Sequence, residues 1–569
     1  MRSGMRNTAA ATLCIVLLRV LSGSAVEEKA DAQPKIAQVF FAQQHVQTPD
    51  GPYFKLVGNL EALVKVQVYS QTDRRSPAVC ARLKLGSGTL ELPLKGPAEL
   101  PKPLSGDPLL MEQRYEDSFT AIIPREWIAP GLKVTVDLKE GNSNILDSVV
   151  FDKLNIGAPT KLVMTMFDFH FFGGDKDKDY PKGWFEELGP RLPVAEIELR
   201  RVRNIIFDKL VMRPQAGRPA ILCGSMVEYA KKTGIGFDGE QAMTLKWNAA
   251  LKEAAGAGLE GTRRLYYSNI YGVPCGGEAW GLSGVGNGKG QGYVLHELGH
   301  CFSLPDLSSG KALANYPYIG PMHGIPAPAA GLPHVGPTWG FDLSQRTFLS
   351  PVATNGQYRK DPMRGGGANE EGGPGIFRFF SDYHCSKIRD YLERTLIVRD
   401  ESGRYLGWNQ QSGSYSTVVH EKGAPSVPVE DDVDVISILA SASLVTPEAN
   451  IVYPPIGPYK AGYIRFFDAT SAADRGQACT AGFDDSNCNV CLRVTQGGKV
   501  KTYLVKDKLS RSNETSFCVF AVNMPARDGA VTHADLLHTP GVMGKGIGPE
   551  CKVLYRWIKD IAMEERNEL

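Results

Sequence analysis

The chain has 569 residues, enough for about three domains, and its 63 lysines and arginines nearly balance its 62 aspartates and glutamates. A chain this close to neutrality has no basic field to attract nucleic acid or anionic lipid, and no acidic excess typical of disorder. We therefore expect no nucleic-acid partner, and we expect a local site to select the ligand.

The beginning of the chain is typical of an export signal. Arg2 and Arg6 precede an apolar run at 9–18, and the small residues at 23–25 offer a cleavage point. The run is far shorter than the ~20 residues that a spanning helix needs, and no later segment reaches that length. We predict a signal peptide over 1–25 and a secreted mature chain that inserts no segment into a membrane.

Residues 36–155 have the pattern of strands. Apolar residues alternate or run together in "FKLVGNLEALVKVQVYS" and "LKVTVDL", and Gly, Pro, Asn and Asp turns interrupt them at short intervals. Short strands at this spacing predict a β-sandwich-like N-terminal domain over 36–155.

Residues 157–415 have a different texture. Helical patterns such as "EQAMTLKWNAALKEAAGAG" alternate with short strands and long glycine-rich loops. This mixture predicts a domain of the α+β class. Long irregular loops inside a compact domain are commonly functional, so we expect the site in this domain.

The stretch "GQGYVLHELGHCFSLPDL" places His296 and His300 four residues apart, with Glu297 after the first. On a helix, side chains at i and i+4 lie on one face, as two ligands of one metal ion must. Glu297 then points about 100° away, where it can hold a water without being a ligand. With only 10 histidines in the chain, chance would produce this spacing about 0.01 times. The pattern predicts a hydrolytic site with one zinc ion per chain.

A catalytic zinc commonly has three protein ligands and one open position. One group of zinc proteases takes the third ligand six residues after the second histidine, which in this chain is Asp306. A carboxylate oxygen is an ordinary zinc ligand, so we predict Asp306, with His323, His334 and His384 as the alternatives. Ser303 stands where that pattern has a glycine of positive φ, and a serine there could strain or redirect the turn.

Proteases of this group also pass a methionine beneath the metal in a tight turn. The stretch "KDPMRGGG" supplies Met363, with a proline before it and glycines after it. An amphipathic helix is expected to follow, with these residues on one face: Ile376, Phe379, Phe380, Tyr383 and Ile388. We predict Met363 as the methionine of this turn.

The glycine-rich run "GLSGVGNGKGQG" before the histidines could form the rim of a cleft, where a substrate strand would pair with an exposed edge. An oxyanion formed in such a cleft needs hydrogen-bond donors. Tyr316, Trp339 and Tyr383 are the candidates.

Strand patterns return after 423, together with half of the ten cysteines that follow the export segment: Cys80, Cys223, Cys275, Cys301, Cys385, Cys479, Cys488, Cys491, Cys518 and Cys551. In an exported chain such a cluster indicates disulfide bonds, although Cys488-x-x-Cys491 alone resembles half of a zinc ribbon. We predict a cysteine-containing β domain with disulfides over 424–569.

Taken together, "LHELGHCFSLPD", "GPTWGFD", "DPMRGGG" and "FDFHFFGGDKDKDYPKGWFEEL" resemble the secreted zinc metalloprotease family of dictomallein, the ToxR-regulated lipoprotein TagA and the mucinase StcE. The N-terminal "FFAQQHVQTPDGPYFKLVGNLEALVKV" resembles the β module before their catalytic domain, so the resemblance covers about 36–415. It implies a metzincin-like zinc protease domain over 157–415 flanked by β-sandwich-type domains. It also implies endopeptidase activity on protein or glycoprotein substrates, with a preference for mucin-type O-glycosylated proteins.

His296, Glu297 and His300 match the motif of that family directly. The third ligand departs from it, because those proteases have a histidine at the position of Asp306, preceded by Gly-Leu-Gly where this chain has Ser-Leu-Pro. An H-E-x-G-H motif that ends in aspartate is similar to the small snapalysin proteases, in which the aspartate is a ligand.

The sequence thus predicts metal-assisted peptide hydrolysis, with zinc on His296, His300 and Asp306 and with Glu297 as the general base. One alternative is a catalytically silent zinc-containing protein that binds glycoproteins through its β domains. The presence of Glu297 argues against it, because a binding protein needs no general base. The other alternative is the class of zinc peptidase whose third ligand is a glutamate on a later helix, here Glu370 or Glu371.

Overall fold

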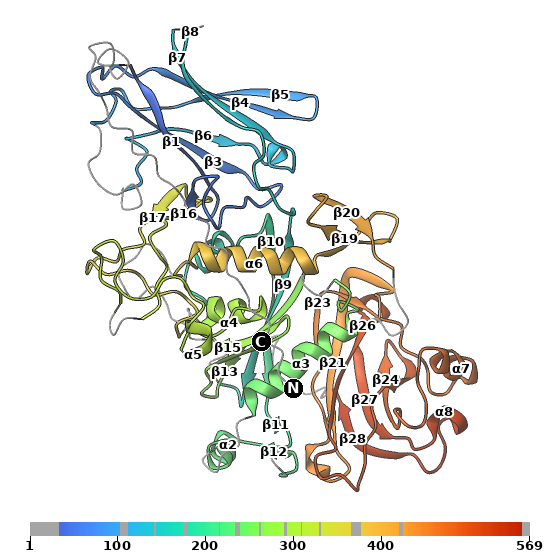
Figure 1. The fold of residues 1–569 in the computed structure, drawn as a ribbon. Helices are drawn as coiled ribbons and strands as arrows, with labels where there is room; N and C mark the ends of the chain where they lie inside the picture. Colours follow the sequence, from blue (N-terminus) through green and yellow to red (C-terminus); the bar gives the residue numbers. More distant parts are fainter. Residues whose placement is uncertain are drawn as a thin grey trace, which may run out of the picture.

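The computed structural model describes residues 33–102, 112–141, 144–174, 179–215, 217–233, 239–260, 263–288, 293–308, 310–328, 332–365, 377–419 and 425–559. The chain is a mixture of helix and strand in which strands predominate (Figure 1). The predicted signal peptide over 1–25 lies outside the described residues, as do Glu370, Glu371 and Ile376.

The N-terminal strands form two antiparallel sheets of four strands around one core. The first sheet has the order β2-β1-β3-β6, with β1 Lys35–Ala42, β2 Val46–Gln47, β3 Ala62–Tyr69 and β6 Phe119–Ile123. The second has the order β5-β4-β7-β8, with β4 Ala78–Leu85, β5 Gly88–Leu94, β7 Lys133–Glu140 and β8 Asn144–Phe151. Alternate side chains of β3, Val64, Val66 and Val68, enter the shared core, as the period of two in a strand requires.

A five-stranded sheet forms the centre of the molecule, in the order β10-β9-β13-β15-β14 (Figure 1). Its strands are β9 Lys161–Phe171, β10 Glu196–Phe207, β13 Arg264–Tyr271, β14 Gly277–Trp280 and β15 Ser283–Asn287. The first four in the order are mutually parallel, and only the edge strand β14 is antiparallel. Strand β9 is buried along nearly its whole length, because both of its faces are covered.

Helices cover the two faces of this sheet. Phe167 and Phe169 of β9 pack with Trp247 of α3 (Glu240–Ala254) on one face. Met164 and Met166 pack on the other face, in a cluster with Leu298 of α4 (Tyr293–Cys301). Helix α6 (Asp382–Thr395) adds Ile388 and Leu392 to that second cluster. The sheet therefore fixes α4, which carries the two histidines.

Shorter elements lie between the strands and helices named so far. They are η2 Arg125–Trp127, α1 Trp184–Leu188, η3 Gly189–Arg191, β11 Leu210–Met212, β12 Ile221–Cys223, α2 Met226–Thr233, α5 Gly310–Leu313, β16 Gly340–Asp342, β17 Thr347–Leu349, β18 Ile397–Arg399, β19 Tyr405–Asn409 and β20 Ser414–Thr417.

The C-terminal strands form two further antiparallel sheets. One contains β21 Glu430–Ala442, β22 Ile451–Val452, β23 Ile456–Tyr463 and β26 Cys518–Pro525. The other has the order β25-β24-β27-β28, with β24 Val490–Gln496, β25 Lys499–Val505, β27 Val531–His538 and β28 Lys552–Ile558. Short helices lie between them, namely η5 Pro447–Ala449, α7 Ala472–Thr480, η6 Ala526–Asp528 and α8 Val542–Lys545.

The C-terminal region packs directly on the central sheet rather than standing apart from it. One apolar cluster joins Phe167, Phe207 and Trp247 of the central region to Tyr453 and Tyr459 of the C-terminal region. The rings of Phe207 and Tyr453 have centroids 4.3 Å apart. A core shared in this way holds the two regions in one orientation.

The N-terminal region is also joined to the centre by backbone pairing. The amide of Val46 donates to the carbonyl of Trp339 over 3.0 Å, and the amide of Phe341 donates to the carbonyl of Gln44 over 2.8 Å. Between them, Nε2 of the buried His45 lies 2.9 Å from the carbonyl oxygen of Phe380. The N-terminal region thus reaches the segment immediately before α6.

Two predictions from sequence are wrong. The predicted disulfides are absent, because all ten cysteines in the described residues are free. Cys488 and Cys491 are instead buried in an apolar cluster, where the Sγ of Cys491 lies 3.2 Å from Oγ1 of Thr539. Free cysteines are commonly buried as small apolar residues.

The helix expected after Met363 begins later than its apolar pattern suggested. Ser381 caps α6 by accepting a hydrogen bond from the amide of His384, so Phe379 and Phe380 lie before the helix in non-helical backbone. A hydroxyl that satisfies a free amide of the first turn defines the start more strongly than apolar spacing does. In the parts of the chain that the structure describes, no helix is both long and apolar enough to cross a bilayer.

Candidate metal centre

Helix α4 ends in a turn that sends the chain back toward its own histidines. The amide of Ser303 donates to the carbonyl of His300, and the amide of Leu304 donates to the carbonyl of Gly299, each over 2.9 Å. This pair of bonds terminates a helix around one residue of positive φ, and Ser303 has a φ of 65°. Ser303 therefore adopts the left-handed conformation that the family pattern assigns to glycine, and the turn at the end of α4 forms without a glycine.

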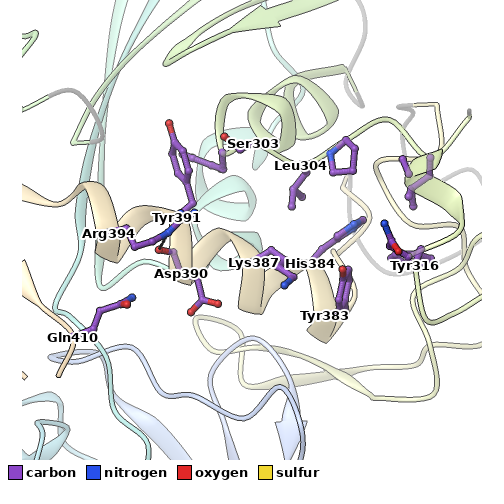
Figure 2. A pocket seen from close by; sticks show the side chains of 15 residues that line it. Ser303, Leu304, Tyr316, Tyr383, His384, Lys387, Asp390, Tyr391, Arg394 and Gln410 are labelled. Carbon is purple, nitrogen blue, oxygen red and sulfur yellow. Dashed lines mark hydrogen bonds between the residues drawn. The ribbon is translucent and has the colours of Figure 1, made fainter. Parts of the chain in front are cut away.

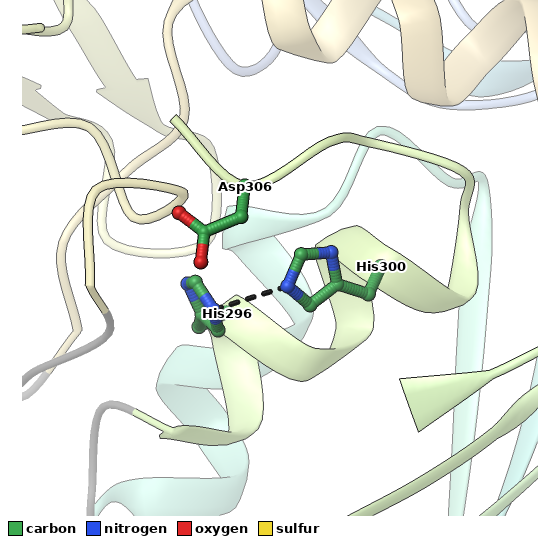
Figure 3. Close-up of side chains that lie close together, drawn as sticks. All are labelled: His296, His300 and Asp306. Atoms are coloured by element: carbon green, nitrogen blue, oxygen red, sulfur yellow. Dashed lines mark hydrogen bonds between the residues drawn. The ribbon is translucent and has the colours of Figure 1, made fainter. Parts of the chain in front are cut away.

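His296, His300 and Asp306 come together after this turn (Figure 3). One ligand atom from each lies within 4.8 Å of the others, and His296 is buried while the other two are half-buried. This is the set of three that the sequence predicted. Among the residues that the structure describes, no other group of histidine, cysteine and carboxylate side chains has this geometry.

The alternative histidine ligands are not part of this group. His384 is buried with Nδ1 2.9 Å from a carboxylate oxygen of Asp361. His334 is also buried, its Nε2 lies 3.0 Å from the carbonyl oxygen of Gly320, and its ring stacks on Tyr358. Both rings are therefore engaged elsewhere.

Two backbone carbonyls fix the tautomers of the paired histidines. Nδ1 of His296 lies 2.9 Å from the carbonyl oxygen of Pro362, and Nδ1 of His300 lies 2.9 Å from that of Leu304. A carbonyl can only accept, so each Nδ1 must carry the proton, and each neutral ring presents the lone pair of Nε2.

These two lone pairs face each other, because the Nε2 atoms are 3.1 Å apart (Figure 3). Two acceptors at this distance repel unless a cation lies between them. Burial lowers the pKa of His296, so this ring favours its neutral form, which is the form that binds a metal ion. The donor set of two imidazoles and one carboxylate suits a divalent metal of the zinc type, so the residues fit the expected ion.

Asp306 is held in its ionised form. Burial alone would raise its pKa, but the pKa is lowered overall, and hydrogen bonding from Ser308 is the largest cause that lowers it. The amide of Ser308 donates to Oδ1 over 2.7 Å. An ionised carboxylate with one oxygen held by the backbone is an oriented ligand for a cation.

Glu297 lies on the side of α4 that faces the edge strand β14. Its side chain is 3% exposed, and Oε2 receives no hydrogen bond from any described residue. Burial, Glu278 and Asp306 raise the pKa of Glu297 to about 8. A cation on the nearby histidines would favour the ionised form, so this carboxyl group suits proton transfer near neutral pH.

Met363 lies beneath α4, fully buried. Its carbonyl accepts from the amide of Leu307, and its Sδ packs so closely on Gly299 that a Cβ there would overlap it. Met363 thus occupies the place expected from the sequence, under the histidine pair.

The sequence did not reveal which groups support these residues. Pro362 and Leu304 act through their carbonyls, and any residue has a carbonyl. Gly277 of β14 borders Glu297 so closely that a side chain at this position would collide with the glutamate. The sequence did not indicate this contact, because glycine is frequent in this region. The role of Asp361 in supporting the site was indicated only by its position in "KDPMRGGG", two residues before Met363.

A cavity of about 510 Å³ lies on the other side of the loop 302–307, between that loop and α6 (Figure 2). Ser303 and Leu304 line it from the loop, and Tyr383 and Lys387 line it from the helix. Tyr316, an oxyanion candidate, also borders this cavity, and its hydroxyl is bonded between the carbonyl oxygen of His334 at 2.7 Å and the carboxylate of Asp361 at 3.0 Å. That hydroxyl is therefore used to support the site from behind.

Comparison with known proteins agrees with this geometry. Dictomallein of Burkholderia pseudomallei (strain 1710b) is 27% identical over 593 residues, which cover 90% of this chain and 82% of the relative. Dictomallein of Burkholderia mallei (strain ATCC 23344) is 26% identical over the same shares. Dictomallein-4 of Dictyostelium discoideum is 24% identical over 520 residues, which cover 81% of this chain and 83% of the relative.

The resemblance to dictomallein is thus confirmed, and a protease is expected to act on a protein substrate. The model of the Peptidase M66 family matches residues 111–397, a segment that includes the central sheet, the histidine pair, Asp306 and Met363. The chain therefore belongs to the Peptidase M66 family, whose members are metallopeptidases.

Proposed function

We propose that the protein is a secreted zinc metalloendopeptidase. The observation that carries this proposal is the pair of Nε2 lone pairs 3.1 Å apart with the carboxylate of Asp306 beside them. Zinc bound by His296, His300 and Asp306 would supply a Lewis acid that polarises the scissile carbonyl and makes a water acidic.

The residues of the chain supply the rest of the reaction. Glu297 takes a proton from the attacking water and returns it to the leaving amine, which is the role of a general base and then of a general acid. Its burial and its free Oε2 suit this exchange. Pro362 and Leu304 keep the histidine rings in the tautomer that leaves Nε2 free.

The edge strand β14 is our candidate for the surface that binds the peptide. It is antiparallel, among the described strands it pairs only with β15, and Gly277 places it against Glu297. A substrate strand paired with its free edge would lie beside the metal centre.

We propose a metzincin-like catalytic domain flanked by β-sandwich-type domains. This is supported by the central sheet with its single antiparallel edge strand, by the methionine beneath α4, and by the two sheets that share the N-terminal core. Secretion is supported by the charged and apolar beginning of the sequence. Mucin-type O-glycosylated proteins are proposed as substrates because four motifs resemble the family that includes StcE.

The test pairs zinc content with peptide-bond cleavage in the purified chain. We expect one zinc per chain and cleavage in the wild type, whereas Glu297→Gln should keep the zinc and lose at least about 100-fold in kcat. Glu253→Gln on the exposed side of α3 is the matched control, and it should change neither quantity. A wild type that holds zinc but cleaves neither a mucin-type glycoprotein nor an unglycosylated protein would favour the silent binding protein.

A second comparison tests the third ligand. Asp306→Ala should lose zinc, while Glu370→Ala and Glu371→Ala should retain it. Loss of zinc from either glutamate variant, with retention in Asp306→Ala, would instead favour the class of zinc peptidase with a glutamate ligand.

A further inference from the structure

The carboxylate of Asp361 is the centre of a buried hydrogen-bond cluster next to the metal centre. Its side chain has no exposed surface. Oδ1 accepts from the amide of Met363 over 2.9 Å and lies 2.9 Å from Nδ1 of His384. Oδ2 accepts from the amide of Ser381 over 3.1 Å and lies 3.0 Å from the hydroxyl of Tyr316, whose single proton is shared with the carbonyl oxygen of His334 at 2.7 Å. Three N–H groups and one hydroxyl thus surround both oxygens of one carboxylate.

Asp361 controls the position of the segment that touches α4. The next residue, Pro362, gives its carbonyl to Nδ1 of His296, and Met363 packs on Gly299. Because Asp361 bonds the amide of Met363 across Pro362, its carboxylate closes a short turn around that carbonyl. The orientation of the His296 ring therefore depends on where Asp361 is held.

The donors to Asp361 come from two other parts of the chain. Ser381 and His384 belong to the start of α6, and Tyr316 lies in the loop after α5. Figure 2 shows Tyr316 and His384 next to each other at one end of the cavity behind the site. The hydroxyl of Tyr316 also lies 3.0 Å from Oγ of Ser381, so the donors are themselves connected.

We propose that Asp361 is a positioning residue for the metal centre, which it connects to α6 and to Tyr316. This inference rests on the proposed zinc site. Asp361 is not a ligand, and it acts through the carbonyl of Pro362 on His296. Groups that orient the ligands of a metal typically change metal affinity or activity 10- to 100-fold when they are removed, which is roughly the effect to expect here.

Asp361→Asn in the full-length chain tests the proposal. The substitution keeps the size of the side chain but replaces one acceptor oxygen with an amide that can only donate, against two donors that need an acceptor. We expect zinc affinity, measured by competition with a chelator, to fall about 10- to 100-fold. We also expect a changed visible absorption spectrum of the Co²⁺-substituted protein and a lower kcat with little change in KM.

Asp535→Asn is the matched control. Asp535 is likewise buried, and its carboxylate is bonded by Arg493, Arg556 and His533 in the C-terminal sheet β25-β24-β27-β28. This variant should lose stability in the same way but keep zinc affinity and the Co²⁺ spectrum of the wild type. A loss of zinc from both variants alike would overturn the proposal, because it would be a consequence of destabilisation alone.

Tyr316→Phe removes a single donor and covers the case in which Asp361→Asn does not fold. It should weaken zinc binding several-fold and alter the Co²⁺ spectrum in the same direction. Unchanged affinity and spectrum in a folded variant of either kind would overturn the proposal. A wild type that binds no zinc would overturn the proposed function instead, so the two failures can be told apart.

Discussion

Gly277 in the edge strand β14 lies directly against Glu297, so that a Cβ at Gly277 would overlap Oε1 of the glutamate. The two residues come from opposite sides of the cleft that we propose, one from the strand and one from α4. The absence of a side chain at Gly277 leaves the space in which the carboxyl group lies. The shape of the strand therefore fits the carboxyl group of Glu297.

Gly277→Ala is expected to displace Glu297 and to lower kcat/KM by roughly 100-fold, since small displacements of a catalytic group have effects of that size. Zinc content should not change, because neither residue belongs to the group of three ligands. Gly276→Ala is the control, since a Cβ at Gly276 would lie 3.4 Å from the side chain of Gln241, an ordinary contact. Equal activity of the two variants in a peptide cleavage assay would contradict this account.

Gly299→Ala tests the contact between α4 and Met363. Alanine favours helix over glycine by about 1 kcal/mol, but here its Cβ would overlap Sδ of Met363, and overpacking of a core costs about 1–3 kcal/mol. We expect a lower free energy of unfolding and weaker zinc binding. Gly476→Ala in α7 has nothing near its Cβ and should instead be stabilising.

A double variant separates the overlap from other effects of Gly299→Ala. Met363→Ala destabilises the buried core on its own, but in its presence Gly299→Ala should cost less than in the wild type, because the overlapping atom is gone, so the two changes should be non-additive. Denaturant unfolding of the four proteins measures this coupling. Additive effects would mean that the two residues do not press on each other.

Local periodicity was enough to predict the helix that carries His296, Glu297 and His300, because all three lie within five residues. Asp306 was predicted from its distance along the chain, and the structure brings it into the group because one turn at Ser303 separates it from α4. Such features depend on a few consecutive residues, which a sequence shows directly.

The supports of the site depend on residues that are far apart in the sequence. Asp361 is bonded by Ser381, by His384 and by Tyr316, which lies 45 residues before it. Pro362, whose carbonyl orients the ring of His296, lies 66 residues after that histidine. No spacing rule connects residues so far apart. The prediction of disulfides failed for a related reason, since cysteine spacing does not determine which thiols lie close together in space. Packing across elements decides these features.

Ser303 offers a test of backbone strain at the turn before Asp306. A residue other than glycine with a φ of 65° is strained by about 1–2 kcal/mol. Glycine removes this strain, but its greater freedom in the unfolded chain offsets part of the gain in stability. We expect Ser303→Gly to raise the free energy of unfolding by up to about 1 kcal/mol and to keep zinc. Ser303→Val should lower it, because β-branched residues are rare outliers at positive φ. Destabilisation by glycine in denaturant unfolding would show that the serine side chain matters more than the strain.

His45 connects the N-terminal region to the carbonyl of Phe380, one residue before the cap of α6. Burial lowers the pKa of His45 to about 4, which Arg389 reinforces, and the charges of Asp382 and Asp361 only partly offset it. The unfolded chain binds the proton more tightly, with a pKa near 6.5. This contribution to stability is therefore complete above about pH 6.5 and is lost as the pH falls toward 4.

The free energy of unfolding should therefore fall by roughly 2 kcal/mol as the pH is lowered from 7 to 4.5, because His45 takes up a proton more readily in the unfolded chain. His45→Gln can still donate to the carbonyl of Phe380 but does not titrate, so its free energy of unfolding should fall less over the same range. Denaturant unfolding at the two pH values, with wild type and variant side by side, measures the difference. Parallel losses in the two proteins would assign the acid sensitivity to other groups and leave His45 as a neutral contact between the regions.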